Sequence, residues 1–85
     1  MTDKISFKKS VSKDLKKLGK MEANRLLEKI SSDLPKIVDS CPLLKGKFTG
    51  LRKYRVGEYQ VIFSILNNIL LIVRIGHRRD IYKGQ

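Results

Sequence analysis

The chain has 85 residues, 41% of them hydrophobic and 32% charged, which is enough for one small domain and too few for a second. We therefore treat residues 1–85 as a single domain. The sequence contains 19 Lys and Arg but only 8 Asp and Glu, and its formal net charge of +11 exceeds the magnitude of about 2–8 that suffices for solubility. This excess predicts a polyanionic partner, which could be a nucleic acid, a membrane surface or an acidic protein.

Several classes of protein are excluded by what the sequence lacks. A single cysteine, Cys41, excludes an internal disulfide, and with a single histidine, His77, it does not supply an ordinary zinc site. The N-terminal residues do not lead into an apolar stretch, and the longest apolar run, Ile69–Val73, is far shorter than the roughly 20 residues of a membrane span. The sequence therefore predicts a cytoplasmic protein with no metal, no cofactor and no membrane partner.

The first half of the chain predicts a strand followed by helix. Lys4–Phe7 alternates apolar and polar residues, as a short strand does. Ser10 is expected to cap a helix that begins at Val11 and places Val11, Leu15 and Leu18 on one stripe. Gly19 is suited to end this helix with a positive φ.

A second helix is expected from about Met21 to Asp33, where Pro35 ends or kinks it. The two helices would form a hairpin with their lysines in water. These lysines are Lys13, Lys16, Lys17 and Lys20.

After a connection over Asp39–Gly50, the apolar period changes to two. Strands are predicted over Leu51–Val56, Tyr59–Leu66 and Ile69–Ile75. Gly57-Glu58 and Asn67-Asn68 form the two tight turns, the second of type I′ because Asn tolerates positive φ. The last strand is apolar at almost every position, which indicates a central strand covered on both faces. The predicted fold class is α+β: a short strand, a two-helix hairpin, and a three-stranded antiparallel meander with the helices on one face.

The residues that could carry chemistry are cations interleaved with tyrosines in the second half, where residues 45–85 carry 9 Lys and Arg against 2 acids. No phosphate-binding glycine loop or nucleophilic serine elbow is present. Cationic residues and tyrosines suit metal-free RNA cleavage, in which the 2′-hydroxyl attacks the adjacent phosphate, Arg and Lys stabilise the charge, and a Tyr near cations acts as base. The alternative is a basic face that binds phosphates without chemistry.

Two motifs resemble those of the RelE/ParE superfamily of toxin–antitoxin toxins. They are RKYRVGEYQVIF at residues 52–63 and GHRRDIY at residues 76–82, with Leu44-Lys45-Gly46 before them. The expected order of strands and helices is also RelE-like, so the resemblance covers essentially the whole chain. It implies a ribosome-dependent mRNA endonuclease, an inhibitor of translation that is held inactive by an antitoxin.

The resemblance also implies roles for particular residues. Lys53 and Arg55 correspond to phosphate-binding cations on a strand, Arg78 to the arginine that stabilises the transition state, and Tyr82 to the base. Further residues are implied as RNA contacts: Lys45, Arg52, Gln60, His77 and Arg79. His77 could act as an acid or a phosphate ligand, or be an ordinary turn histidine.

One position departs from the family pattern, because Gln60 stands where RelE-like nucleases commonly have Arg. Gln can bind a phosphate oxygen but brings no charge, so activity could be reduced. The ParE branch of the superfamily acts on DNA gyrase and does not need the cationic set. The retained cations favour the RelE-like branch over the ParE-like alternative.

The remaining aromatic residues and the cysteine are expected to be structural. Phe7, Phe63 and Tyr59 are predicted in the core, while Tyr54 could face the core or stack on a base. Cys41 is expected to be a bystander. A toxin this basic also predicts an acidic, partly disordered antitoxin that folds onto its surface, in addition to ribosome and mRNA as partners.

Overall fold

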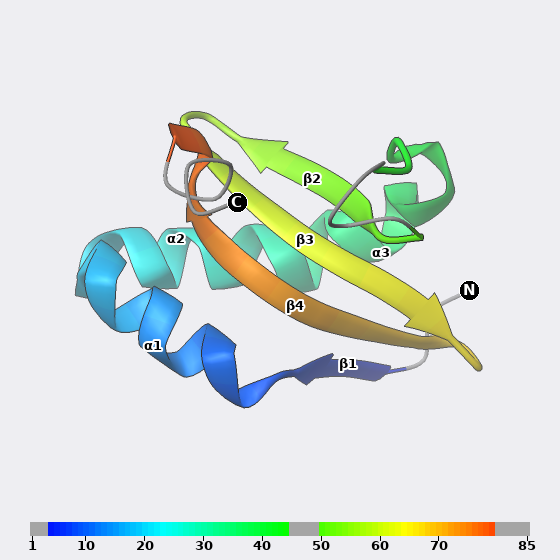
Figure 1. Ribbon diagram of the computed structural model, residues 1–85, viewed down its shortest axis with the longest axis horizontal. Helices are drawn as coiled ribbons and strands as arrows, with labels where there is room; N and C mark the ends of the chain where they lie inside the picture. The colour runs from blue at the N-terminus through cyan, green and yellow to red at the C-terminus, as the bar shows by residue number, and fades with distance from the viewer. Residues whose placement is uncertain (1–3, 45–49, 80–85) are drawn as a thin grey trace.

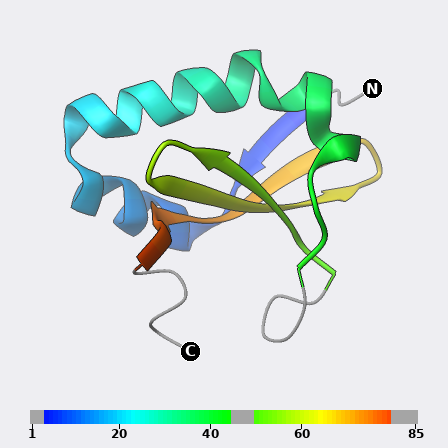
Figure 2. The ribbon, with the colours of Figure 1, turned by 90° about the horizontal axis from the view of Figure 1, so that it is seen from above.

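The computed structural model describes residues 4–44 and 50–79, which form one four-stranded sheet with helices against one of its faces (Figure 1, Figure 2). The elements follow in chain order: β1 (Lys4–Phe7), α1 (Lys9–Leu18), α2 (Lys20–Ser32), α3 (Leu34–Ile37), the 3₁₀ turn η1 (Val38–Ser40), β2 (Arg52–Val56), β3 (Tyr59–Leu66) and β4 (Ile69–His77). The strand order is β1-β4-β3-β2, with β1 parallel to β4 and the other pairs antiparallel. The α+β prediction and the antiparallel meander are confirmed.

The two hairpin turns form where the sequence predicts them, because each depends on residues that accept unusual backbone angles. Asn67 and Asn68 have φ of 52° and 64°, as a type I′ turn requires. Gly57 has φ of 59° in the turn that joins β2 to β3. The turns therefore fix the register of the meander, in which Val56 is opposite Tyr59 and Leu66 is opposite Ile69.

The core lies between the helices and one face of the sheet. Leu26, Ile30 and Leu34 come from the helical side. The sheet supplies a matching set of fully or almost fully buried residues: Val61, Phe63, Leu70, Ile72 and Ile75. Burying this many large apolar side chains is the main source of stability in so small a domain.

Strand β4 is central, as predicted, but its two faces are covered unequally. Leu70, Ile72 and Ile75 are buried under the helices, whereas Leu71 and Val73 on β4 are only partly buried. The spacing of three between Ile72 and Ile75 arises at a β-bulge, where Ile62 pairs with Arg74 and Phe63 pairs with Ile72. Val73 is the extra residue, and it packs with Ile62 on the other face.

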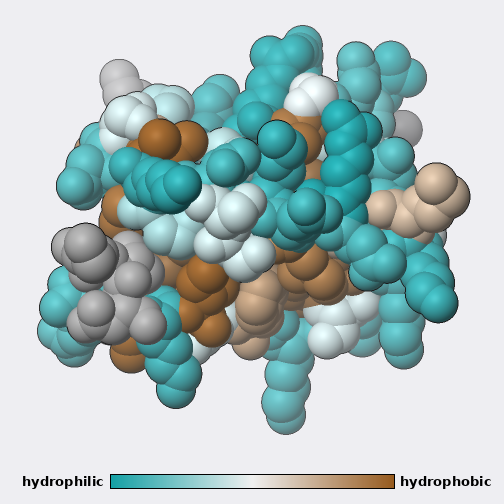
Figure 3. Space-filling view, turned by 180° about the vertical axis from the view of Figure 1, so that it is seen from behind, coloured by the Kyte–Doolittle hydropathy of each residue, from teal (hydrophilic) through white to brown (hydrophobic). Residues whose placement is uncertain are grey.

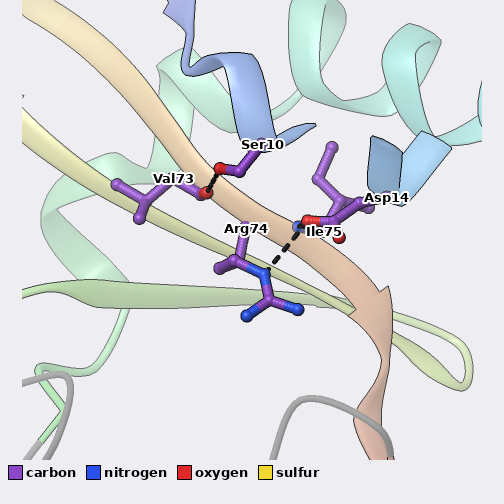
Figure 4. Close-up of polar contacts among 5 residues, drawn as sticks. All are labelled: Ser10, Asp14, Val73, Arg74 and Ile75. Atoms are coloured by element: carbon purple, nitrogen blue, oxygen red, sulfur yellow. Dashed lines mark hydrogen bonds and ion pairs between the residues drawn. The ribbon is translucent and has the colours of Figure 1, made fainter. Parts of the chain in front are cut away.

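Helix α1 closes the edge of β4 beyond the point where β1 ends. β1 pairs with β4 only as far as Ile72, and the chain then turns into α1. Ser10 Oγ donates a hydrogen bond to the Val73 carbonyl at 3.2 Å, and Asp14 accepts one from the Ile75 N–H at 3.1 Å (Figure 4). Side chains of α1 therefore satisfy the backbone groups of β4 that a longer β1 would otherwise bind.

Two predictions for the first half of the chain were wrong. The first helix begins at Lys9 with Lys8 at its N-cap, so Ser10 lies within the helix and binds the neighbouring strand instead of capping. Phe7 is 45% exposed because it ends the edge strand β1 beside an apolar hollow of about 280 Å³. This hollow is also lined by Leu15 and Leu27, and apolar atoms show among hydrophilic side chains on the helical side in Figure 3.

The predictions for Gly19 and Pro35 are confirmed, with one addition. Gly19 has φ of 88° and separates α1 from α2. Helix α2 ends at Ser32, and Pro35 then occupies the first turn of the short additional helix α3. No helix within residues 4–44 and 50–79 is long and apolar enough to cross a membrane.

Candidate nucleic-acid interface

The face of the sheet opposite the helices carries the predicted strand cations. In the antiparallel register Lys53 is opposite Ile62, and Arg55 is opposite Gln60, which in turn is opposite Gly76. Directly opposed residues project from the same face of a sheet. Lys53, Arg55 and Gln60 therefore share the face that the helices leave uncovered, which we call the cationic face.

The turn between β2 and β3 brings Arg78 to the same end of the sheet as Arg55. Arg55 Nε donates to the Gly57 carbonyl at 3.1 Å, and the Arg78 N–H donates to the Glu58 carbonyl at 2.9 Å. Both arginines are thus bound to consecutive carbonyls of one turn. Arg55, Arg78 and Arg79 are all exposed, so their guanidinium groups are accessible to a phosphate.

Gln60 is a buried polar residue on this face, next to the fully buried Ile62. It is only 3% exposed, and its Oε1 has no hydrogen-bond partner among the described residues. A buried acceptor without a partner costs about 1–3 kcal/mol. Gln60 therefore places an acceptor without a partner among the described residues between Arg55 and Gly76.

Arg52 lies on the opposite face from Lys53 and Arg55. It is opposite Phe63, and its Nη1 donates to the Cys41 carbonyl at 2.8 Å and approaches the Asp39 carbonyl at 3.4 Å. These contacts fasten the connection between η1 and β2. The structure thus gives Arg52 a structural role and does not group it with the cationic face.

His77 also projects toward the helical side. It is opposite Tyr59 in the register, and the two rings meet edge to face with centroids 5.7 Å apart. Its Nε2 lies 3.3 Å from Glu58 Oε2. A pocket of about 340 Å³ beside it is lined by Asp14, Lys17 and Arg74 among others.

Two of the predicted site residues, Lys45 and Tyr82, lie outside the described residues.

Tyr54 and Tyr59 both pack against the main core. The core position predicted for Tyr59 is therefore confirmed, and of the two alternatives for Tyr54 the structure shows the core position. Burial raises the pKa of Tyr54, and the charge of Asp33 adds to this, so its phenol stays protonated at neutral pH. Phe63 is fully buried as predicted.

Cys41 is buried, and its Sγ lies 3.5 Å from the Ile37 carbonyl. Burial raises the pKa of the Cys41 thiol, and Arg52 opposes the shift more weakly. A buried, protonated thiol is a poor nucleophile, which agrees with the bystander role. Within the described part of the chain no group of three His, Cys, Asp or Glu side chains is arranged to hold a metal ion.

Sequence reasoning missed Asp14, which proves central to the site's framework. It is 8% exposed, and its Oδ2 accepts hydrogen bonds from the Ile75 N–H and from Arg74 Nε, each at 3.1 Å (Figure 4). Asp14 interrupts the lysines of α1 on the apolar side of that helix, between Val11 and Leu15. An acid on the buried stripe of an amphipathic helix was the signal that could have identified it.

The described residues thus form a two-layer α+β domain with a cationic sheet face and two adjacent exposed arginines, Arg78 and Arg79, at one end of the sheet. The chain matches the family described as the ParE toxin of the type II toxin–antitoxin system parDE over residues 5–82, and it belongs to that family. A search of the curated proteins found no match. The protein is thus a toxin of a type II toxin–antitoxin system within the RelE/ParE superfamily.

Solved structures show the same fold. The toxin–antitoxin complex RelBE2 from Mycobacterium tuberculosis is similar with a TM-score of 0.80 at 22% identity, over 92% of this chain and 100% of that one. The archaeal RelE–RelB complex from Pyrococcus horikoshii has a TM-score of 0.64 at 29% identity, over 92% and 97%. An E. coli RelE mutant bound to an antitoxin peptide has a TM-score of 0.70 at 16% identity, over 99% and 94%. The RelE-like fold is therefore confirmed.

Proposed function

We propose that this toxin is a ribosome-dependent endonuclease that cleaves mRNA without a metal ion. The observation that carries the proposal is the grouping of Lys53 and Arg55 on the face that the helices leave uncovered, with the Arg78 backbone N–H bound to the same turn as Arg55. Phosphoryl transfer adds negative charge at phosphorus, and closely placed guanidinium and ammonium groups stabilise that charge.

In the proposed reaction the 2′-oxygen of the RNA attacks the adjacent phosphorus, and the bond from phosphorus to the 5′-oxygen breaks. The products are a 2′,3′-cyclic phosphate and a free 5′-hydroxyl. A base takes the proton from the 2′-hydroxyl, and the leaving oxygen receives one. We assign the base to Tyr82 and the charge stabilisation to Arg78, with Lys53 and Arg55 holding the phosphates.

The proposal is tested with purified toxin, programmed ribosomes and primer extension on the mRNA. Arg78→Ala and Tyr82→Phe should each reduce cleavage on the order of 10²-fold or more, the usual scale for a positioned electrostatic or acid–base group. Arg25→Ala is the matched control, since Arg25 is exposed on α2 in a surface pair with Glu22. Full cleavage by both variants would contradict the nuclease assignment.

A second function is favoured by the family match itself, which is to the ParE toxins. In that case the target would be DNA gyrase and not mRNA. Gyrase supercoiling assays with the same variants distinguish the two, because a gyrase inhibitor would leave mRNA intact. A non-catalytic ribosome-binding module would leave both mRNA and gyrase unaffected while still binding ribosomes.

The proposed partner of the toxin is an acidic antitoxin. Similar solved structures are complexes of RelE with RelB, and a protein of charge +11 attracts an acidic segment. β2 is an edge strand of the sheet and carries Lys53 and Arg55, so an acidic segment bound across this strand would neutralise both cations. Co-expression of the antitoxin should restore the growth of cells that express the toxin. A short acidic protein encoded by the neighbouring gene that neither binds the toxin nor restores growth would count against this proposal.

A further inference from the structure

Arg74 on β4 is a cation that the sequence motifs do not single out and that the proposed reaction does not use. It lies opposite Ile62 on β3, and Ile62 lies opposite Lys53 on β2, so the three residues form one row across the sheet. Neighbouring strands are about 4.8 Å apart, which places the backbones at the two ends of this row about 10 Å apart. The row that begins with Lys53 on the cationic face therefore ends in a second cation on β4.

The β-bulge in β4 keeps Arg74 out of the core. Side chains alternate between the faces of a regular strand, so residue 74 would project toward the helices with Ile72. The extra residue Val73 shifts this alternation, and Ile75 is buried instead. Bulges are frequent beside functional sites, where they redirect a side chain. Because β1 pairs with β4 only as far as Ile72, Arg74 lies at an edge that no described strand covers.

Asp14 orients the guanidinium of Arg74 without using its terminal nitrogens. Asp14 Oδ2 accepts a hydrogen bond from Arg74 Nε at 3.1 Å, and Figure 4 shows the two terminal nitrogens directed away from this carboxylate. The Asp14 side chain is 9% exposed, whereas the Arg74 side chain is 39% exposed. The fork of the guanidinium is therefore fixed in direction and open to solvent, which suits two parallel hydrogen bonds to a phosphate.

The pocket of about 340 Å³ beside Arg74 lies between α1 and the last part of β4. Apart from His77, the charged side chains that line it are two cations, Lys17 and Arg74, and one carboxylate, Asp14. Lys17 is exposed and lies about one helical turn after Asp14, so a positive charge remains uncompensated in the pocket. Small-molecule sites occupy about 300–1,000 Å³, so a pocket of this size can hold a phosphate with its attached sugar.

We propose that this pocket binds a backbone phosphate of single-stranded RNA, held by the Arg74 guanidinium and the Lys17 ammonium. The choice of RNA as the occupant rests on the proposed nuclease function, which assigns phosphates to Lys53 in the same row. An RNA strand bound on the cationic face reaches the pocket at the β4 end of this row. The carboxylates of an acidic protein would pair with the same two cations, and the test separates these two occupants.

The test follows the side-chain NMR resonances of Arg74 Nε–H and of the Lys17 ammonium in the full chain while a short single-stranded RNA is added. The RNA carries 2′-O-methyl groups, which prevent attack by the 2′-oxygen, so binding is measured whether or not the toxin cleaves RNA. RNA should shift both resonances at a lower concentration than a poly-glutamate peptide of equal charge. The proposal is overturned if RNA leaves both resonances unchanged, if poly-glutamate is equally effective, or if inorganic phosphate alone is equally effective.

Two substitutions measure how much the pocket contributes to RNA affinity. Arg74→Ala should weaken binding about fivefold and Lys17→Ala about threefold, the scale of one partly exposed charge pair. Each should also reduce the slope of log affinity against log salt by about 0.7, as expected for one lost phosphate contact on a single strand. Lys16→Ala is the matched control, because Lys16 is exposed on the same helix, carries the same charge and does not line the pocket.

The control variant should lose less than about twofold in affinity and keep the salt slope of the wild type. Arg74→Ala leaves the buried Asp14 without its cation, so Lys17→Ala decides the outcome if the arginine variant does not fold. Losses no larger than that of Lys16→Ala would overturn the proposal. If the wild type does not cleave mRNA on ribosomes, the proposed function fails, while these binding measurements still decide whether the pocket binds RNA.

Discussion

Replacing Asp14 should reveal how strongly helix α1 holds the strand that leads to the cationic face. In Asp14→Ala the buried Ile75 N–H loses its acceptor, which costs about 1–3 kcal/mol. The ion pair with Arg74 adds less than about 1 kcal/mol, because the Arg74 side chain is 39% exposed. The expected loss in the free energy of unfolding is therefore about 2–3 kcal/mol. Asp14→Asn keeps an acceptor oxygen and should lose only about 1 kcal/mol.

Urea denaturation of the purified toxin measures this difference. With a slope of about 1 kcal/mol per molar urea for a domain of this size, the midpoint should fall by about 2–3 M in Asp14→Ala and about 1 M in Asp14→Asn. Lys13→Ala is the matched control, since Lys13 is exposed on the same helix and should change stability by less than about 0.5 kcal/mol. Equal losses in the Ala and Asn variants would refute the reasoning, because the acceptor oxygen would then contribute nothing.

Three further predictions concern the rest of the domain. Arg52→Ala should lower the unfolding free energy by about 1–2 kcal/mol through its lost carbonyl contacts, whereas Arg55→Ala should lower cleavage and leave the urea midpoint nearly unchanged. Asn67→Val should lower the melting temperature by about 4–16 °C, because a β-branched residue at φ of 52° costs about 1–2 kcal/mol, while Asn68→Gly should not lower it. Because burial raises the pKa of the Cys41 thiol above its ordinary value of 9.0, the unfolded chain loses that proton first, so stability should fall as pH rises above about 9. Cys41→Ala should reduce this fall in urea titrations.

The sequence predicted those parts of the fold that short-range patterns determine. The turns at Gly57 and Asn67-Asn68 and the bounds of β3 follow from residues that are neighbours in the chain. Ser10 was misjudged because the Val73 carbonyl, 63 positions away, competes for its hydroxyl. Phe7 was misjudged because alternation shows which face a side chain takes and not how far the helices extend over that face.

In the candidate site, too, the sequence predicts only what short-range patterns determine. Alternation along β2 placed Lys53 and Arg55 on one face, and the register of the hairpin, set by its turn, added Gln60. The same alternation places Arg52 on the other face, whereas the resemblance groups the whole run of cations together. The engagement of His77 with Glu58 and Arg79 needs the β3–β4 pairing and was not accessible from sequence.

The scarce acids of this basic chain explain how its cations stay in place. Glu22 and Asp33 make exposed pairs along α2, which contribute little to stability. Asp14 and Glu58 instead both bind the last part of β4: the Asp14 carboxylate at Arg74 and Ile75, and the Glu58 carboxylate at His77. The Glu58 backbone carbonyl also accepts from the N–H of Arg78, the residue after β4. Repulsion among the arginines at this end would otherwise favour splaying of the strand. Two carboxylates on either side of β4 thus hold a strand end that a +11 chain would tend to release, and they do so without occupying the face on which Lys53 and Arg55 lie.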